Sequence, residues 1–283
     1  MDVPAQQSRG RIFAIDRKGS ERVIRLNAIS WRFRKVWKRN LLTVRETWKI
    51  NFITPLLEPL FYVFAFGLGF SGMIEVIRYG GAELSYVQFI APALVGTAVM
   101  YNAFFETTYS SFVRMYYQKT YDGILATPLS MEEIIIAEIV WSATRATVAA
   151  LLIMTVLGIF GFVSLPFAYL LTPVAFLGGL AFGALGLFIT GIVPSIEMFN
   201  LPFFLFVTPM FLFSGTFFPI SNLPGWVTPV ARALPLHNLV ELTRFFCIRH
   251  HETPLLFSLI YLFCFTIVFT LLALVTMRRR LIK

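Results

Sequence analysis

Three ionisable side chains interrupt the long apolar runs of this 283-residue sequence and are its first candidates for chemistry. Glu58 lies in the run 50–70, and Glu138 and Arg145 lie in the run 134–160. A charge in an apolar membrane segment is costly, so it normally faces protein or a water-filled cavity. For Glu58 two interpretations stay open, a place on a transport pathway and a bond to a neighbouring helix. Glu138 and Arg145 are seven residues apart and share a helix face, so they are expected to pair through neighbours or across a subunit interface.

Patterns for catalysis or metal binding are missing from the sequence. No glycine is followed by lysine, so the phosphate loop that binds ATP is absent. His237 stands alone and His250-His251 lacks the spacing of a zinc site, so these are predicted to be surface or interface histidines. Cys247 and Cys264 form neither a metal pattern nor a disulfide framework. We therefore expect no metal site and no catalytic residues, and a membrane enzyme is a weaker alternative.

The composition indicates an integral membrane protein. Hydrophobic residues make up 57% of the chain and charged residues only 14%, which is too little polar surface for a soluble globule of this size. Most of the basic residues lie before the first apolar run or after the last one. Because positive flanks stay in the cytoplasm, both termini are predicted to be cytoplasmic and the number of spans even. A nucleic-acid partner is not expected.

The apolar runs predict an all-α fold with six transmembrane helices. These are expected at about 50–70, 87–105, 134–160, 169–193, 198–213 and 254–277. A polar segment, 1–27, precedes them and a basic tail, 278–283, follows them. Residues 28–49 have apolar residues at helical spacing with basic residues between them, which is typical of an amphipathic helix that binds anionic lipid headgroups at the interface. Its candidate functional residues are Trp31, Phe33, Arg34, Trp37 and Arg39.

The segment between the second and third spans, 118–133, carries several local structure signals. D-G at 122–123 and T-P at 127–128 indicate turns, and Ser130 with Glu133 forms a capping box that starts the next helix. A shaped polar segment of this kind is suited to dock a soluble partner. The simpler alternative is a capped turn.

The segment 214–238, before the last predicted span, is apolar but cannot be one continuous helix. Prolines remove backbone donors and disfavour helix just before themselves. The segment has four of them: Pro219, Pro224, Pro229 and Pro235. Irregular backbone at membrane depth needs protein or a water-filled cavity around it, so we predict a re-entrant segment over a translocation path. An ordinary interfacial loop is the alternative.

Three stretches of the sequence resemble the permease subunits of ABC type-2 exporters. They are FLFSGTFFPISNLPGWVTPVARALPLHNLVELTR (211–244), ILATPLSMEEIIIAEI (124–139), and the region from KRNLLTVRETW to FAFGLGF (38–70). Together they cover most of the chain in the expected order. Among subfamilies the sequence is most similar to the permeases that export lipo-oligosaccharide nodulation signals and capsular or O-antigen polysaccharides. Exporters of hydrophobic drugs share the same signatures and remain the alternative.

The resemblance implies a homodimeric, multi-pass permease of the cell inner membrane, working with two copies of a cytoplasmic ATPase subunit. ATP and Mg would be bound by that partner, and this chain would hold no cofactor. The other partners implied are membrane lipids and a glycan or glycolipid substrate. ATP would close the ATPase dimer, and the first and fifth spans would separate at the dimer axis. A stand-alone channel or secondary transporter is disfavoured, because it would be expected to carry more intramembrane charge or internal repeats.

The resemblance also assigns roles to residues by position. In the loop that couples to the ATPase they are Tyr121, Asp122, Gly123, Ile124, Leu125, Thr127, Pro128, Leu129, Ser130, Glu132 and Glu133. At the exit gate in the re-entrant segment they are Phe217, Phe218, Pro219, Leu223, Pro224, Gly225 and Trp226. The pathway candidates are Glu58, Tyr62, Phe66, Phe203 and Phe206, whose rings suit sugar faces or a lipid tail, although Phe is also ordinary lipid-facing filler.

Overall fold

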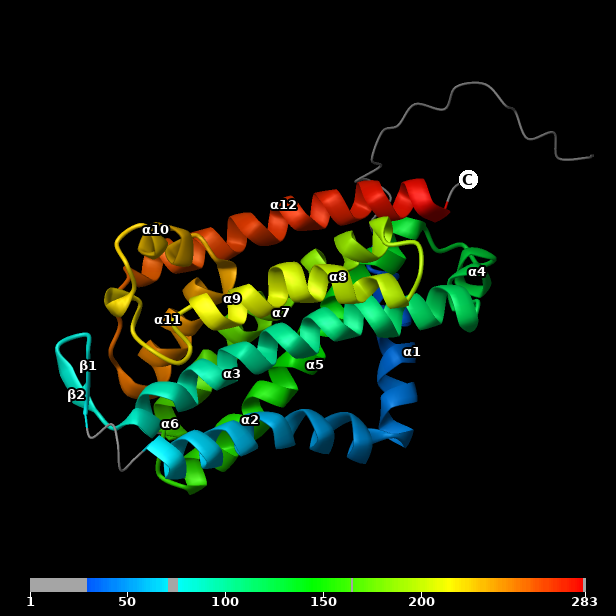
Figure 1. Ribbon diagram of the computed structural model, residues 1–283. Helices are drawn as coiled ribbons and strands as arrows, with labels where there is room; N and C mark the ends of the chain where they lie inside the picture. The colour runs from blue at the N-terminus through cyan, green and yellow to red at the C-terminus, as the bar shows by residue number, and fades with distance from the viewer. Residues whose placement is uncertain (1–29, 71–75, 164, 282–283) are drawn as a thin grey trace, which may run out of the picture.

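The computed structural model describes residues 30–70, 76–163 and 165–281. The predicted polar segment 1–27, the first two residues of the predicted amphipathic helix, part of the loop after the first span and the last two residues of the basic tail lie outside this part of the chain. The described residues form a bundle of long helices with two different ends (Figure 1). One end carries α1, α4 and the end of α12, and we call it the basic end. The other carries the two strands, α10 and α11, and we call it the hairpin end.

Within the described part of the chain, four helical stretches are long and apolar enough to cross a membrane. They are Tyr86–Tyr117 (α3, Tyr86–Phe105, continued by the π-helical turns η2, Glu106–Ser110, and η3, Val113–Tyr117), α5 (Met131–Ile159), Tyr169–Ile192 (η4, Tyr169–Leu171, and α7, Thr172–Ile192) and α12 (Leu255–Leu281). The other two predicted spans are also helical. They are α2 (Trp48–Phe70) and a broken stretch of η5 (Glu197–Phe199), α8 (Asn200–Pro202), η6 (Phe203–Val207) and α9 (Thr208–Phe213).

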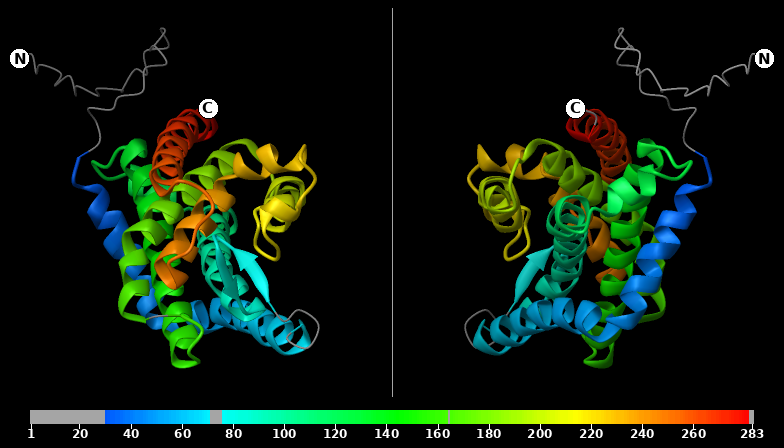
Figure 2. Two further views of the ribbon diagram at one scale, coloured as in Figure 1. Left: turned by 90° about the vertical axis from the view of Figure 1, so that its left-hand side faces the viewer. Right: turned by 90° about the vertical axis from the view of Figure 1, so that its right-hand side faces the viewer.

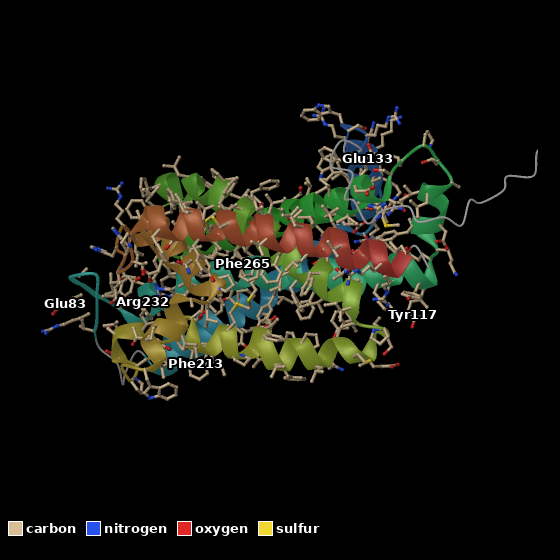
Figure 3. The ribbon with its side chains drawn as sticks, turned by 90° about the horizontal axis from the view of Figure 1, so that it is seen from above. Glu83, Tyr117, Glu133, Phe213, Arg232 and Phe265 are labelled. Carbon is tan, nitrogen blue, oxygen red and sulfur yellow. The ribbon has the colours of Figure 1, made fainter. Side chains whose placement is uncertain are left out.

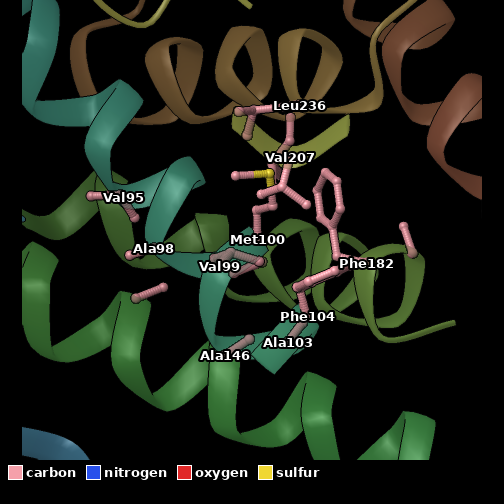
Figure 4. Close-up of a cluster of buried hydrophobic side chains, with 14 of the residues drawn as sticks. Val95, Ala98, Val99, Met100, Ala103, Phe104, Ala146, Phe182, Val207 and Leu236 are labelled. Atoms are coloured by element: carbon pink, nitrogen blue, oxygen red, sulfur yellow. The ribbon is translucent and has the colours of Figure 1, made fainter. Parts of the chain in front are cut away.

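The centre of the bundle is built from α3, α5, α7 and α11 (Pro235–Ile248). Apolar side chains such as Met100, Phe182 and Leu236 meet there with no exposed surface (Figure 4). Glycines let α7 approach α5 closely, because a Cβ built on Gly179 would lie 2.6 Å from the Cα of Ala143. The G-x-x-x-G spacing at 179–183 is therefore used for helix packing, as such spacing usually is.

At the basic end, helix α1 (Phe33–Glu46) runs across the bundle rather than along it (Figure 1). It lies on the outside against α5 (Figure 2). The short helix α4 (Thr120–Leu125) precedes the capping box that starts α5, in which Ser130 accepts from the Glu133 backbone N–H. The sequence signal for a turn at 122–123 was wrong, because both residues are helical. The capping box was predicted correctly.

The hairpin end adds two short strands to an otherwise helical fold. Strands β1 (Ile77–Tyr79) and β2 (Ala82–Leu84) pair antiparallel across Gly80 and Gly81, which have φ values of 55° and 79°. The same end also holds η7 (Ile220–Asn222), α10 (Val227–Arg232) and α11 (Figure 1). The short α6 (Leu165–Ala168) precedes η4. The irregular segment ends at Leu234, four residues earlier than predicted, because Pro235 occupies the first turn of α11, where proline is tolerated.

Candidate functional site

A buried ionic network lies near the basic end, where α3 continues into its π-helical turns. Glu106, 2% exposed, accepts hydrogen bonds from Arg114 (2.8 Å) and from the Trp141 indole (3.0 Å), and it also pairs with Arg145. Removing a carboxylate from water is costly unless it is paired and hydrogen-bonded. Through these bonds Glu106 fixes the extension of α3 against α5.

Glu138 forms the second half of the same network. It is fully buried and accepts from Ser111 (2.9 Å) and from Asn40 of α1 (3.3 Å), and it pairs with Arg114. Arg39 in turn donates to Asn40 (2.6 Å), and burial lowers the pKa of its guanidinium, which is charged at neutral pH in any case. Three elements thus share one network of charges.

The network explains the pattern of Glu138 and Arg145 on one face of α5. The two residues are linked through Arg114 and Glu106, which is one of the two arrangements expected from the sequence. Sequence reasoning missed Glu106 and Arg114 themselves. Their signal was present, since both are charged residues in the apolar continuation of the second predicted span.

The segment assigned to ATPase coupling is tied to the start of the interface helix. Ser30 donates through its hydroxyl and its backbone N–H to Glu133, and Arg32 donates to the carbonyl of Pro128 (3.1 Å). Trp37 donates to Thr144 of α5 (3.1 Å). Of the other interface-helix candidates, Trp31 and Arg34 are exposed and in cation–π contact at 5.1 Å, and Phe33 is half-buried.

The coupling candidates differ in how far they can reach a partner. Tyr121 and Glu133 are buried, and five more are less than fully exposed: Ile124, Leu125, Leu129, Ser130 and Glu132. The candidates open to solvent are Asp122, Gly123, Thr127 and Pro128. Figure 3 shows Glu133 and Tyr117 at the same end of the molecule, opposite Glu83. The exposed residues of the segment therefore lie at the basic end of the bundle, opposite the hairpin.

The basic tail is bound to this end as well. Arg280 donates to the carbonyls of Thr190 and Val193, which end α7, and to Pro194 (3.3 Å). Arg278 lies 3.8 Å from Glu132 at the start of α5. Carbonyls at a helix C-terminus lack intrahelical partners, so a guanidinium from α12 satisfies them.

Two pathway candidates line a cavity of about 250 Å³ between α2, α3 and α5. Glu58 and Tyr62 lie on its α2 side, and Tyr101, Glu106 and Arg145 lie on its other sides. Glu58 thus lines a cavity, which fits the first of its two interpretations, a place on a transport pathway. The second interpretation was a bond to a neighbouring helix, and no such bond is found among the described residues.

The remaining pathway candidates separate. Phe66 stacks on Tyr62 (ring centroids 5.9 Å apart), and Phe203 packs on Tyr101 (6.2 Å). Together with the two tyrosines, which line the cavity, they form a cluster of rings that we call the aromatic wall. Phe206 is 58% exposed and lies with Trp226 on a separate apolar groove. The structure does not bring it to the others.

The gate candidates also divide. Phe217 packs edge-on against Phe66 (5.3 Å) and against Phe211 (5.0 Å), so it is in contact with the aromatic wall. Trp226 is 77% exposed and Phe218 is 38% exposed. Among the others, Pro219 is buried, Leu223 is half-buried, and Pro224 and Gly225 are exposed. Among the ring–ring contacts of the described residues, Phe217 is the gate candidate that packs on pathway candidates, namely Tyr62 and Phe66.

A second buried ionic cluster lies at the hairpin end. Arg244, 1% exposed, donates to the carbonyl of Gly215 (2.5 Å) and stacks on Phe89 (3.9 Å) beneath the hairpin. Glu241 lies 3.7 Å from it and accepts from Tyr79 of β1. Burial, followed by the charge of Glu241, raises the pKa of Tyr79 despite the opposing charge of Arg244.

His237 belongs to the same region, and its predicted surface or interface position was wrong. It is fully buried, with its ring nitrogens near the carbonyl of Ser214 (3.2 Å) and the hydroxyl of Thr253 (3.3 Å). Glu252, at the end of this region, has a raised pKa because of partial burial and the nearby Glu241. Sequence reasoning assigned no role to Glu241 or Arg244, because burial beneath the hairpin depends on tertiary contacts. No group of metal-ligating side chains occurs in the part of the chain that the structure describes.

Comparison of the sequence with known proteins identifies the family of this helical bundle. The profile of the ABC-2 type transporter family matches residues 32–247. The chain belongs to the ABC-2 type transporter family. It is therefore a multi-pass membrane permease, a transport subunit of a system in which an ABC ATPase is the partner.

Relatives of this ABC-2 type transporter cover most of its length. Nodulation protein J of Rhizobium meliloti (strain 1021) is 36% identical over 225 residues, which are 78% of this chain and 83% of the relative. Nodulation protein J of Rhizobium leguminosarum bv. trifolii is 34% identical over 249 residues, 88% of this chain and 93% of the relative. The probable multidrug ABC transporter permease YbhR of Escherichia coli (strain K12) is 26% identical over 174 residues, 60% of this chain and 46% of the relative.

Proposed function

We propose that the chain is the permease subunit of an ATP-driven exporter that carries a lipo-oligosaccharide or other lipid-linked glycan out of the cell. The observation that carries this proposal is the similarity to nodulation protein J, which extends over more than three quarters of the chain at about one third identity. The exported molecule follows from the resemblance of the sequence to lipo-oligosaccharide and polysaccharide permeases. The amphiphilic walls of the cavity beside Glu58 and Tyr62 suit such a molecule.

In this proposal the permease has six spans, including α2 and the broken helix 197–213, with the basic end in the cytoplasm of the inner membrane. The position of α1, the basic tail and Lys119 at that end supports the orientation. Two copies of the permease would associate with two copies of the ATPase, which would bind ATP and Mg. The exposed apolar side chains of η6 and α9, such as Phe204 and Leu205, are available for the second copy.

Movement of the ATPase would reach the permease through the solvent-facing residues of the segment 121–133. Because Glu133 is bonded to Ser30 and Pro128 to Arg32, a shift of this segment also moves α1. Because Glu138 is bonded to Asn40, the shift then reaches the buried ionic network beside the cavity. ATP can drive export only if the ATPase contacts this segment differently in its two states.

Co-purification with the cognate ATPase tests the proposal. The test variant combines Asp122→Arg with Ala126→Arg, since both side chains are exposed. The matched control combines Ser221→Arg with Asn222→Arg, an equally exposed pair at the hairpin end. We expect wild type and control to bind the ATPase and the test variant to lose it or its coupled ATP hydrolysis. Equal behaviour of the two variants would contradict the assigned docking surface, and no ATPase binding by wild type would refute the permease proposal.

A second candidate, export of a hydrophobic drug, rests on the similarity to the probable multidrug permease. It predicts that hydrophobic drugs, and not lipo-oligosaccharides, stimulate ATP hydrolysis by the complex. The lower identity and the smaller share of that relative covered favour the first candidate.

A further inference from the structure

Three cavities near the basic end meet at one side chain, Arg145 of α5. The first is the cavity beside Glu58, and the second, of about 530 Å³, lies between α1, the π-helical turns and α5. The third, of about 350 Å³, lies between α1, the start of α2 and α5. Arg145 lines all three, and its side chain is 15% exposed. The third cavity is apolar and the second is polar, so Arg145 lies at the junction of an apolar and a polar space.

The third cavity is apolar and opens towards the surface on which α1 lies. Its walls include Leu41, Leu42, Trp48 and Val148. Leu42 and Trp48 are 52% and 53% exposed, so the protein itself leaves this apolar surface uncovered. A space of this volume, flanked by an amphipathic helix, fits a hydrocarbon chain that comes from the membrane leaflet at the basic end.

The second cavity is polar and carries an excess of positive charge. Arg39, Arg114 and Arg145 line it, whereas the buried carboxylates of the network are Glu106 and Glu138. In the described part of the chain the Arg39 side chain donates to the neutral Asn40, and the Nε atom of Arg114 is buried without a hydrogen-bond partner there. Guanidinium groups with unused donors favour an anionic group with several oxygens.

We propose that the junction of these cavities binds an anionic amphiphile, with its hydrocarbon chain in the apolar cavity beside α1 and its charged headgroup at Arg39 and Arg145. This is a lipid-binding site from which a lipid-linked molecule is loaded into the cavity beside Glu58. That the bound amphiphile is also the exported molecule rests on the proposed function. The site itself rests on the cavities and charges alone.

Trp141 provides a reporter for this site. It lines the polar and the apolar cavity but is only 2% exposed, so lipids around the protein do not reach it. Brominated acyl chains quench tryptophan fluorescence on contact. A variant that keeps Trp141 and replaces the other four tryptophans by Phe therefore reports a chain inside the cavity. A variant that keeps only Trp226, which is 77% exposed, reports the surrounding lipid.

The experiment uses the purified full chain in phosphatidylcholine nanodiscs with increasing amounts of phosphatidic acid that carries brominated chains. We expect Trp141 quenching to saturate at a low fraction of this lipid and to be much weaker with brominated phosphatidylcholine. Arg39→Gln should weaken the apparent affinity about fivefold, the effect of one partly exposed ionic contact. Val148→Phe, which fills the apolar cavity, should abolish the quenching. Trp226 quenching should follow the lipid fraction whatever the headgroup.

Other results would overturn the inference. Absent quenching of Trp141, or equal quenching by both brominated lipids, would contradict an anionic amphiphile site. Displacement of the lipid by excess inorganic phosphate would show a headgroup site without an anchoring chain, which also contradicts it. Co-purification of the ATPase with the same preparation separates the two proposals. If the ATPase binds but Trp141 is not quenched, the lipid site alone is wrong; if quenching occurs without ATPase binding, the exporter assignment alone is wrong.

Discussion

The buried carboxylate of Glu138 is predicted to contribute far more to stability than a surface carboxylate. Glu138 has no exposed surface and is bonded to Ser111, Asn40 and Arg114. Glu138→Gln keeps the shape of the side chain and removes its charge. Breaking a buried ion pair costs about 3–5 kcal/mol, and a hydrogen bond to a charged group contributes about 1.5–3 kcal/mol. In the variant Arg114 keeps its ion pair with Glu106 at 2.8 Å, and its side chain is 14% exposed, so its charge is not left fully unpaired. We therefore expect a loss of stability in the lower of the two ranges, about 2 kcal/mol.

The measurement is the free energy of unfolding of the purified permease, titrated reversibly in mixed micelles. Glu83→Gln is the matched control, because the Arg78–Glu83 pair at 3.3 Å has side chains that are 88% and 64% exposed and should contribute little. A double variant of Glu138→Gln with Arg114→Gln should lose less than the sum of the two single losses, since the pair is broken only once. An equal cost for Glu138→Gln and Glu83→Gln, or strict additivity in the double variant, would refute the network.

Three further variants test the packing. Gly179→Ala should destabilise the bundle by about 1–3 kcal/mol in the same titration, because the new Cβ meets the backbone of α5. Gly225→Ala, with no atom near its Cβ, should leave the stability unchanged. Equal effects of the two variants would exclude a close α5–α7 contact. Arg244→Leu should expose the hairpin to proteases, since the guanidinium stacks on the ring of Tyr79 in β1 (4.9 Å), and unchanged protection would argue against that role. Ser130→Ala should cost about 1 kcal/mol through loss of the cap of α5, and no change in unfolding would contradict the capping box.

Local signals predicted the capping box and the amphipathic helix of the basic end, but not the short helix α4. The capping box at Ser130 and Glu133 needs only four consecutive residues, and the amphipathic pattern of α1 needs only its own sequence. The hairpin also had a local signal that was not used. Gly80-Gly81 between short runs with Ile77 and Leu84 is the dipeptide that favours a two-residue turn, because both residues need positive φ.

The ionic sites could be predicted only in part, because their partners come from distant segments. The sequence showed that Glu138 and Arg145 share a helix face, but not that Arg114, in the π-helical turn η3, pairs with Glu138. The burial of His237 and Arg244 likewise depends on the hairpin and on the segment that contains Ser214. Intrinsic patterns do not contain such contacts, since they arise from packing between elements.

Transport in a reconstituted system tests the central claim most directly. The permease and its cognate ATPase would be placed in proteoliposomes with a labelled lipo-oligosaccharide, and movement of the label across the bilayer would be followed with and without ATP. We predict movement that requires ATP and both subunits and that is lost in the Asp122→Arg, Ala126→Arg variant. Movement of the label without ATP would contradict export of a lipid-linked glycan by this permease. So would an intact complex that does not move the label although a hydrophobic drug stimulates its ATP hydrolysis.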